Sequence, residues 1–177
     1  MPYGMGESMI WNIHQRELPV SAQRAGALLD RVAEPGNPLW PAEHWPRLIL
    51  DRPLQVGADG GHGAIRYACT AYEPGRAMEF TFAPGMPFDG THTFEIVDRG
   101  EQGCVMRHLI VARATTPRGR LLWTFAIRWL HDAVLEELLD RAATELGYPP
   151  ARPARWSPWV RLLRRSLDRV HQAVPAA

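Results

Sequence analysis

Two histidines stand near the ends of a predicted β-hairpin, where their side chains could meet. The stretch from Gly90 to Val111 alternates apolar and polar residues on both sides of the turn-forming sequence DRGEQG. If the turn is centred there, antiparallel pairing places His92 directly opposite His108, with Cβ atoms roughly 4.5–5.5 Å apart. The two-residue period of a strand then points both side chains to the face that carries Phe94. The hairpin therefore predicts two facing imidazoles on the apolar side of a sheet.

A third histidine is expected to face the same interior space. Residues 119–147 show the helical spacing of apolar residues, and His131 lies near the middle of that apolar stripe. Such a helix buries its stripe against the sheet. We therefore expect His92, His108 and His131 to line one cavity, either as general acid–base groups or as hydrogen-bond partners of a ligand oxygen. The alternative is that they are core histidines satisfied by neighbouring polar groups.

Three histidines are also suitable ligands for a metal ion. Histidines that bind metals usually donate their second ring N–H to a carboxylate. The pattern places Asp132 and Glu136 on the opposite face of the helix, so no inward carboxylate is expected near the histidines. We therefore predict no metal and no other cofactor. A phosphate-binding loop, paired metal-binding cysteines and an HExxH motif are also absent from the sequence, and residues 57–63 (GADGGHG) are expected to form a mobile loop at the cavity mouth.

Aromatic and sulfur-containing side chains are expected to form the cavity wall. Residues 63–84 read as a hairpin that turns at Pro74-Gly75, with alternate side chains pointing inward. Arg128 lies at the margin of the helix stripe. A wall of this composition suits an apolar or aromatic ligand. The predicted ligand-binding residues are Tyr67, Met78, Phe80, Phe82, Phe94, Met106, Trp123 and Arg128.

The order of elements predicts an α+β body over residues 1–148. A strand over residues 10–18 and a helix that begins after Ser21 precede a run of antiparallel strands and the long helix. With 177 residues and 46% hydrophobic composition, the chain supports one sizeable core. The first 11 residues lack the features of a signal peptide, so the expected location is cytoplasmic, with Cys69 and Cys104 as free thiols.

Charge divides the chain into a body and a tail. Residues 1–150 have 14 Arg against 18 Asp and Glu, whereas residues 151–177 have six Arg against one Asp. All 20 basic residues are arginine, which excludes mechanisms that need a Schiff-base or phosphate-loop lysine. The acidic body argues against nucleic acid as a partner.

The tail, residues 149–177, is predicted to be a proline-rich linker and a basic amphipathic helix. Ser157 suits the N-cap and Pro158 the first turn of a helix that extends to residue 174. This helix either docks on the acidic body or a second subunit of a homodimer, or adsorbs to an anionic membrane surface through residues 155–174. The predicted apolar stripe consists of Trp159, Val160, Leu163, Leu167, Val170 and Val174.

Four stretches resemble bacterial members of the START-like (SRPBCC) superfamily, of the polyketide cyclase/dehydrase and lipid transport type. They are YEPGRAMEF (72–80), GTHTFEIV (90–97), RHLIV (107–111) and IRWLHDAVLEELLDRA (127–142). The resemblance, which extends from about Ile10 to Gly147, implies a helix-grip fold, in which a curved antiparallel sheet wraps around a long C-terminal helix above a deep hydrophobic cavity.

The resemblance implies an apolar small-molecule ligand but does not imply one reaction. One expectation is a polyketide-type cyclase/dehydratase that uses histidine acid–base chemistry. The alternative is a non-catalytic carrier of a hydrophobic ligand or lipid, in which the histidines are structural. The His/His/Asp iron-binding arrangement of the superfamily's oxygenases is not recognisable in this sequence.

Overall fold

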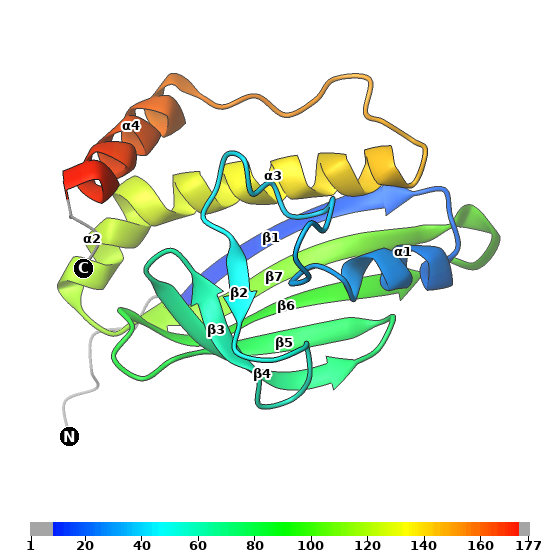
Figure 1. Cartoon of the computed structure of the whole chain (residues 1–177), viewed down its shortest axis with the longest axis horizontal. Helices are drawn as coiled ribbons and strands as arrows, with labels where there is room; N and C mark the ends of the chain where they lie inside the picture. The colour runs from blue at the N-terminus through cyan, green and yellow to red at the C-terminus, as the bar shows by residue number, and fades with distance from the viewer. Residues whose placement is uncertain (1–8, 174–177) are drawn as a thin grey trace.

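A curved sheet of seven antiparallel strands forms the body of the molecule (Figure 1). The computed structural model describes residues 9–173, with side-chain surroundings as far as residue 166. Residues 1–8, to which most of the signal-peptide prediction refers, and the side chains at the last positions of the predicted tail stripe lie outside this description. The strand order is β1-β7-β6-β5-β4-β3-β2. The strands are β1 (Met9–Leu18), β2 (Leu48–Leu50), β3 (Asp59–His62), β4 (Ile65–Glu73), β5 (Ala77–Phe82), β6 (Phe88–Asp98) and β7 (Cys104–Ala114).

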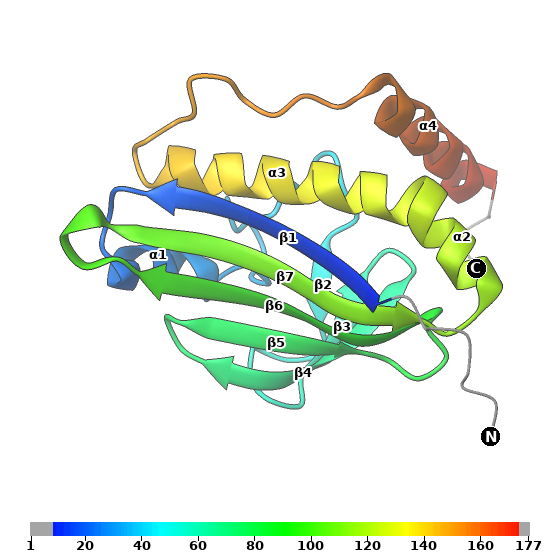
Figure 2. The same ribbon diagram turned by 180° about the vertical axis from the view of Figure 1, so that it is seen from behind.

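In the described part of the chain, four α-helices accompany the sheet. They are α1 (Ala22–Leu29), α2 (Pro117–Leu122), α3 (Arg128–Glu145) and α4 (Pro158–Ala173), and a π-helical turn (Trp123–Ile127) joins α2 to α3. A 3-10 turn (Gly100–Gln102) connects β6 to β7. In Figures 1 and 2, α3 runs along the sheet beside β1, and α4 lies on the side of α3 away from the sheet. None of the helices within residues 9–173 is long and apolar enough to span a bilayer.

The fold confirms the predicted α+β class with a long C-terminal helix and a further helix after it. Ser21 caps α1 by accepting a hydrogen bond from the Arg24 N–H. The long helix begins at Pro117, where the Thr116 side chain accepts from the Gly119 N–H. It ends before Gly147, whose φ of 93° suits glycine. The predicted interval of 119–147 is therefore one helical rod, interrupted by the π-helical turn.

The register of the β6–β7 hairpin differs from the prediction by two residues. His108 is opposite Phe94, and His92 is opposite Ile110. The predicted direct pairing of His92 with His108 is therefore wrong, because the 3-10 turn moves the centre of the loop by one residue. A shift of two residues preserves the face, so both histidines still point to the concave side and are buried.

Residues 57–63 were expected to form a mobile loop, and this prediction is wrong for most of the segment. Asp59–His62 forms β3, which pairs with both β2 and β4. A Cβ at Gly60 would collide with the Ile49 carbonyl oxygen, and one at Gly61 with the Ile65 carbonyl oxygen. These glycines therefore allow neighbouring backbones to approach closely, a role that glycine content alone does not distinguish from a loop.

The core lies between the concave face of the sheet and the helices. Its main cluster joins α3 residues such as Leu138 and Leu139 to sheet residues such as Phe80 and Met106. Helix α1 is attached to the β4–β5 turn, where the Asp30 carboxylate accepts hydrogen bonds of 2.8 and 2.9 Å from the Gly75 N–H. Cys69 and Cys104 are buried free thiols. This core surrounds one end of the space in which the histidines gather.

Candidate functional site

A cavity of about 710 Å³ lies between the concave face of the sheet and the α2–α3 rod. Its wall is mainly apolar and aromatic. Of the residues predicted from the sequence, Tyr67, Phe80, Phe82, Phe94 and Trp123 line it, together with His92, His108 and His131. The other lining residues include Trp40, Trp45, Leu48, His62, Phe88, Ile110, Leu122, Leu130, Val134 and Arg164.

Three of the predicted ligand-binding residues lie elsewhere. Met78 and Met106 are fully buried in the main core cluster rather than in the cavity wall. Arg128 lies over the ring of its neighbour Trp129, with 4.8 Å between the guanidinium carbon and the ring centroid. Arg128 is therefore exposed and lies outside the cavity. On this side of the cavity, histidines and not an arginine supply the polar groups.

The histidines form a continuous row across the concave face of the sheet. The ring centroids of His92 and His108 are 5.6 Å apart, and those of His108 and His131 are 5.0 Å apart. Strands β6 and β7 supply the first two rings and helix α3 the third. Phe80 stacks on His92 at 5.2 Å, and Phe94 meets His108 edge-on at 4.4 Å. The aromatic neighbours hold the rings in place without supplying strong hydrogen-bond partners.

Each of these three histidines has a buried ring nitrogen without a hydrogen-bond partner in the described part of the chain. The atoms are Nε2 of His92, Nδ1 of His108 and Nδ1 of His131. Burial holds the pKa of His92 and of His108 well below the ordinary value, and the neighbouring histidines add to this effect. Burial also lowers the pKa of His131 to about 3. All three imidazoles are therefore neutral at pH 7, with one N–H donor and one acceptor nitrogen each.

A fourth histidine, His62, extends the row and was missed by the sequence analysis. Its Nδ1 lies 2.9 Å from the Tyr67 hydroxyl, and the Tyr67 ring is 4.4 Å from His92. Burial lowers the pKa of His62 to about 4 and raises the pKa of Tyr67 above its ordinary value. Placing residues 57–63 in a loop concealed His62. Gly60 and His62 alternate in the sequence next to a predicted strand, and this alternation was the signal that could have identified a strand containing His62.

A fifth histidine, His14 of β1, lies at the opposite end of the row. Its ring is 5.9 Å from that of His131. Its Nε2 lies 3.0 Å from Asp132 Oδ1 and its Nδ1 lies 2.7 Å from Glu136 Oε1. The prediction that Asp132 and Glu136 face away from the histidines is therefore wrong, because the edge strand β1 runs beside that flank of α3 (Figure 2).

The contacts of His14 make it a charged group at neutral pH. Burial by itself would lower the pKa of His14, but the hydrogen bonds and charges of Asp132 and Glu136 raise it to about 9. Because carboxylates accept at both ring nitrogens, both nitrogens must carry protons. Arg16 continues the network through ion pairs of 3.1 Å with Glu136 and 2.7 Å with Asp140. These contacts attach β1 to α3.

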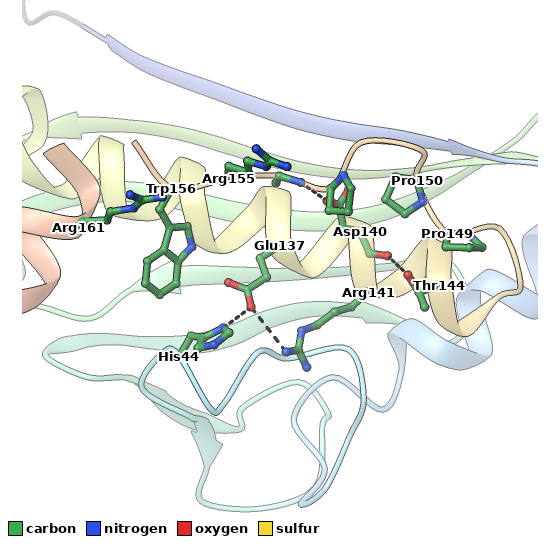
Figure 3. Close-up of a pocket in the computed structure, with 12 residues that line it drawn as sticks. His44, Glu137, Asp140, Arg141, Thr144, Pro149, Pro150, Arg155, Trp156 and Arg161 are labelled. Carbon is green, nitrogen blue, oxygen red and sulfur yellow. Dashed lines mark hydrogen bonds and ion pairs between the residues drawn. The ribbon is translucent and has the colours of Figure 1, made fainter. Parts of the chain in front are cut away.

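A second hollow, of about 510 Å³, is a groove between α3 and the linker that follows it (Figure 3). Figure 3 shows Glu137 between His44 and Arg141, and all three residues line this groove. His44 Nδ1 lies 2.6 Å from Glu137, and the Asp140 carboxylate accepts a 2.6 Å hydrogen bond from the Ala154 N–H. Its polar groups thus pair with one another and attach the linker to α3, so the histidine-lined cavity is the stronger candidate site.

Comparisons with known proteins give matches only at the level of structure. No family model and no curated protein matches the sequence. Norcoclaurine synthase from Thalictrum flavum, solved with dopamine and hydroxybenzaldehyde, is 14% identical, with 82% of this chain and 95% of that chain covered and a TM-score of 0.59. A protein from Thermobifida fusca is 15% identical over 81% of this chain and 98% of that chain, with a TM-score of 0.55.

CalU16 from Micromonospora echinospora covers more of this chain. It is 12% identical, with 93% of this chain and 86% of that chain covered and a TM-score of 0.50. Structural similarity at sequence identities this low shows a common fold but does not show a common chemistry. The chain therefore shares the fold of these solved structures, and this fold is the helix-grip arrangement of a curved antiparallel sheet and a long C-terminal helix that its sequence motifs predicted.

Proposed function

We propose that this protein binds an apolar, aromatic small molecule that carries carbonyl or hydroxyl oxygens, and that it catalyses proton transfer on that molecule. The observation that carries the proposal is the cavity of about 710 Å³, whose apolar wall is interrupted by the row His92, His108 and His131. The volume lies in the range of small-molecule sites, which combine an apolar lining with a few polar groups. Norcoclaurine synthase, which has a similar fold, was solved with two oxygen-bearing aromatic molecules.

The unpartnered ring nitrogens explain why the ligand should carry oxygen. A buried polar atom without a hydrogen bond costs roughly 1–3 kcal/mol, and a ligand oxygen that meets it recovers part of this cost. A neutral imidazole can donate N–H to a carbonyl oxygen on one side and accept a proton on the other. A purely hydrocarbon ligand would leave all three nitrogens unsatisfied.

The proposed reaction belongs to the cyclisation or dehydration type. In its first step, the bond between an α-carbon and its hydrogen breaks, and the proton passes to the acceptor nitrogen of one imidazole. The electron pair of that bond forms a carbon–carbon double bond, and the π pair of the carbonyl moves to its oxygen, which receives a hydrogen bond from the N–H of a second imidazole. The resulting enolate either attacks a second carbonyl or expels a hydroxyl group as water, and the imidazole returns its proton. The apolar wall excludes bulk water.

Binding is tested with a pair of probes that differ by one hydroxyl group, 2-naphthol and naphthalene. Replacing His92 or His108 with Leu should weaken 2-naphthol binding by about tenfold, the equivalent of one hydrogen bond of about 1.4 kcal/mol. Naphthalene binding should stay unchanged or improve, since it makes no hydrogen bond. Quenching of tryptophan fluorescence reports both affinities. If the variants weaken both probes equally, or neither, the polar role of the histidines is wrong.

Catalysis is tested by the exchange of α-hydrogens in 2-tetralone dissolved in D2O. The wild-type protein should accelerate deuterium incorporation, measured by mass spectrometry, and the His92→Leu and His108→Leu variants should lose most of this acceleration. Naphthol binding without any acceleration of exchange would contradict the catalytic half of the proposal and identify a ligand carrier. Mass spectrometry of molecules retained through native purification would then identify the cargo.

A further inference from the structure

We propose a binding site for one divalent transition-metal ion at His14, His131 and Asp132, where β1 meets α3 at the end of the cavity. One ring nitrogen of each histidine and a carboxylate oxygen of Asp132 lie within 4.8 Å of one another. In a tetrahedral site with bonds of about 2.0–2.1 Å, neighbouring ligand atoms are separated by roughly 3.3 Å. The 3.0 Å between His14 Nε2 and Asp132 Oδ1 is close to this spacing.

The surroundings of His14 match those of a metal-ligating histidine. Its Nε2 faces Asp132, while its Nδ1 lies 2.7 Å from Glu136 Oε1. A histidine that ligates through one nitrogen usually donates its other N–H to a carboxylate, which fixes the ring and strengthens its basicity. Asn12 donates a 2.8 Å hydrogen bond to Asp132 Oδ1 and so orients the second ligand. An ion bound here would displace the proton that His14 Nε2 shares with Asp132 Oδ1.

An independent observation comes from His131. Its Nδ1 is buried and has no hydrogen-bond partner in the described part of the chain, although the ring lies beside His14 and Asp132. Ion pairing explains the position of His14 but not this unpartnered nitrogen. His131 also lines the cavity, so the proposed site adjoins the cavity wall at this residue.

The donor set decides which ions fit. Two imidazoles and one carboxylate suit Zn²⁺, Co²⁺ or Fe²⁺, whereas Ca²⁺ and Mg²⁺ prefer sites made of oxygen atoms. The inference does not depend on the proposed function, since metal binding can be measured without an organic ligand. It revises the expectation of no metal, which rested on the placement of Asp132 and Glu136 away from the histidines.

The experiment measures binding of Zn²⁺ by titration calorimetry and of Co²⁺ by its visible absorption, with Mg²⁺ as the comparison ion. The wild-type chain should bind one equivalent of Zn²⁺ or Co²⁺ and no Mg²⁺. His131→Leu removes a ligand without breaking the ion pairs of His14, so its fold should persist while Co²⁺ absorption disappears. Glu136→Gln keeps all three proposed ligands but removes the carboxylate that contacts His14 Nδ1. It should therefore weaken Zn²⁺ binding by about 10- to 100-fold.

A second cluster provides the matched control. Glu43, His44 and Glu137 also have ligand atoms within 4.8 Å of one another, but two of the three are exposed. His44→Leu should leave Zn²⁺ and Co²⁺ binding at the first site unchanged. Circular dichroism of each variant checks that it is folded. Absence of Zn²⁺ and Co²⁺ binding by the wild type, or binding that survives His131→Leu, would overturn the proposal.

Discussion

His108 is fully buried and has a nitrogen without a partner in the described part of the chain, so it costs stability where it stands. Leucine has a similar volume and no polar atom. We therefore expect His108→Leu to leave the free energy of unfolding within about 1 kcal/mol of the wild type or to raise it, since apolar replacement of an unsatisfied group is near neutral. Urea unfolding measures this. A loss of several kcal/mol would instead identify His108 as a structural tie.

Acid should destabilise the fold through the buried histidines. In the unfolded chain their pKa is about 6.5, whereas burial lowers the pKa of His62 to about 4 and those of His92 and His108 well below 6.5. Below pH 6.5 the unfolded state therefore binds more protons, and the free energy of unfolding falls as the pH decreases. His62 alone accounts for at most about 3 kcal/mol between pH 6.5 and 4.

Chemical unfolding at several pH values checks this dependence. In the His62→Gln variant, the fall between pH 6.5 and 4 should be smaller by the contribution of His62. Stability that stays constant from pH 7 to 4 in the wild type would show that these histidines are protonated in the folded protein without cost.

At the scale of elements, β1 is one of the two edge strands of the sheet and pairs only with β7. The His14 contacts with Asp132 and Glu136 hold its free side against α3. Replacing His14 with Leu should lower the free energy of unfolding by about 2 kcal/mol. This value lies between the small effect of breaking an exposed ion pair and the roughly 3–5 kcal/mol lost when a fully buried ion pair is broken. Hydrogen exchange of the β1 amides should accelerate at the same time.

The matched control for this strand is His44→Leu. His44 also pairs with a carboxylate of α3, Glu137, but its side chain is 48% exposed. Removing it should cost less than about 1 kcal/mol and leave β1 exchange unchanged. Equal losses in both variants would show that the position of His14 at the edge strand confers no particular stability.

At the scale of the whole molecule, α4 packs on the outside of the body and contributes Arg164 to the cavity wall. Val160 is buried, and the Arg164 guanidinium lies over the rings of Trp45 and Trp156 at 4.9 and 5.5 Å. Trp45 and Arg164 both line the cavity. We expect Val160→Asp to undock α4, lower the melting temperature and weaken naphthalene binding. Leu162→Asp, at a position that is 52% exposed, should change neither quantity.

The same docking bears on the membrane hypothesis for residues 155–174. Trp159 donates a 3.0 Å hydrogen bond to the Phe125 carbonyl, and Val160 faces the body, so part of the apolar stripe is already occupied. We therefore expect negligible co-sedimentation with anionic vesicles at low salt, both for the full chain and for a chain that ends at Pro150. Binding of the full chain alone would support membrane adsorption by the tail.

Local patterns in the sequence were sufficient for the fold class and for the faces of the main residues. The two-residue period of β6 and β7 places His92 and His108 on the concave side in any register that differs by an even number of residues. Helical spacing likewise places His131 toward the sheet. Caps at Ser21 and Thr116 and the glycine after α3 define helix ends through contacts within a few residues. Such features need no knowledge of distant parts of the chain.

Tertiary structure decided everything that depends on contacts between distant segments. His14 lies 118 residues before Asp132, so only the position of the edge strand beside α3 brings the two together. The role of His62 likewise depended on the pairing of β3 with β2 and β4, which required glycine where backbones approach closely. Periodicity within one element shows which face of that element is buried, and this was enough to predict His92, His108 and His131. The partner of a side chain across an interface is set by packing between elements, so the roles of His14 and His62 were missed.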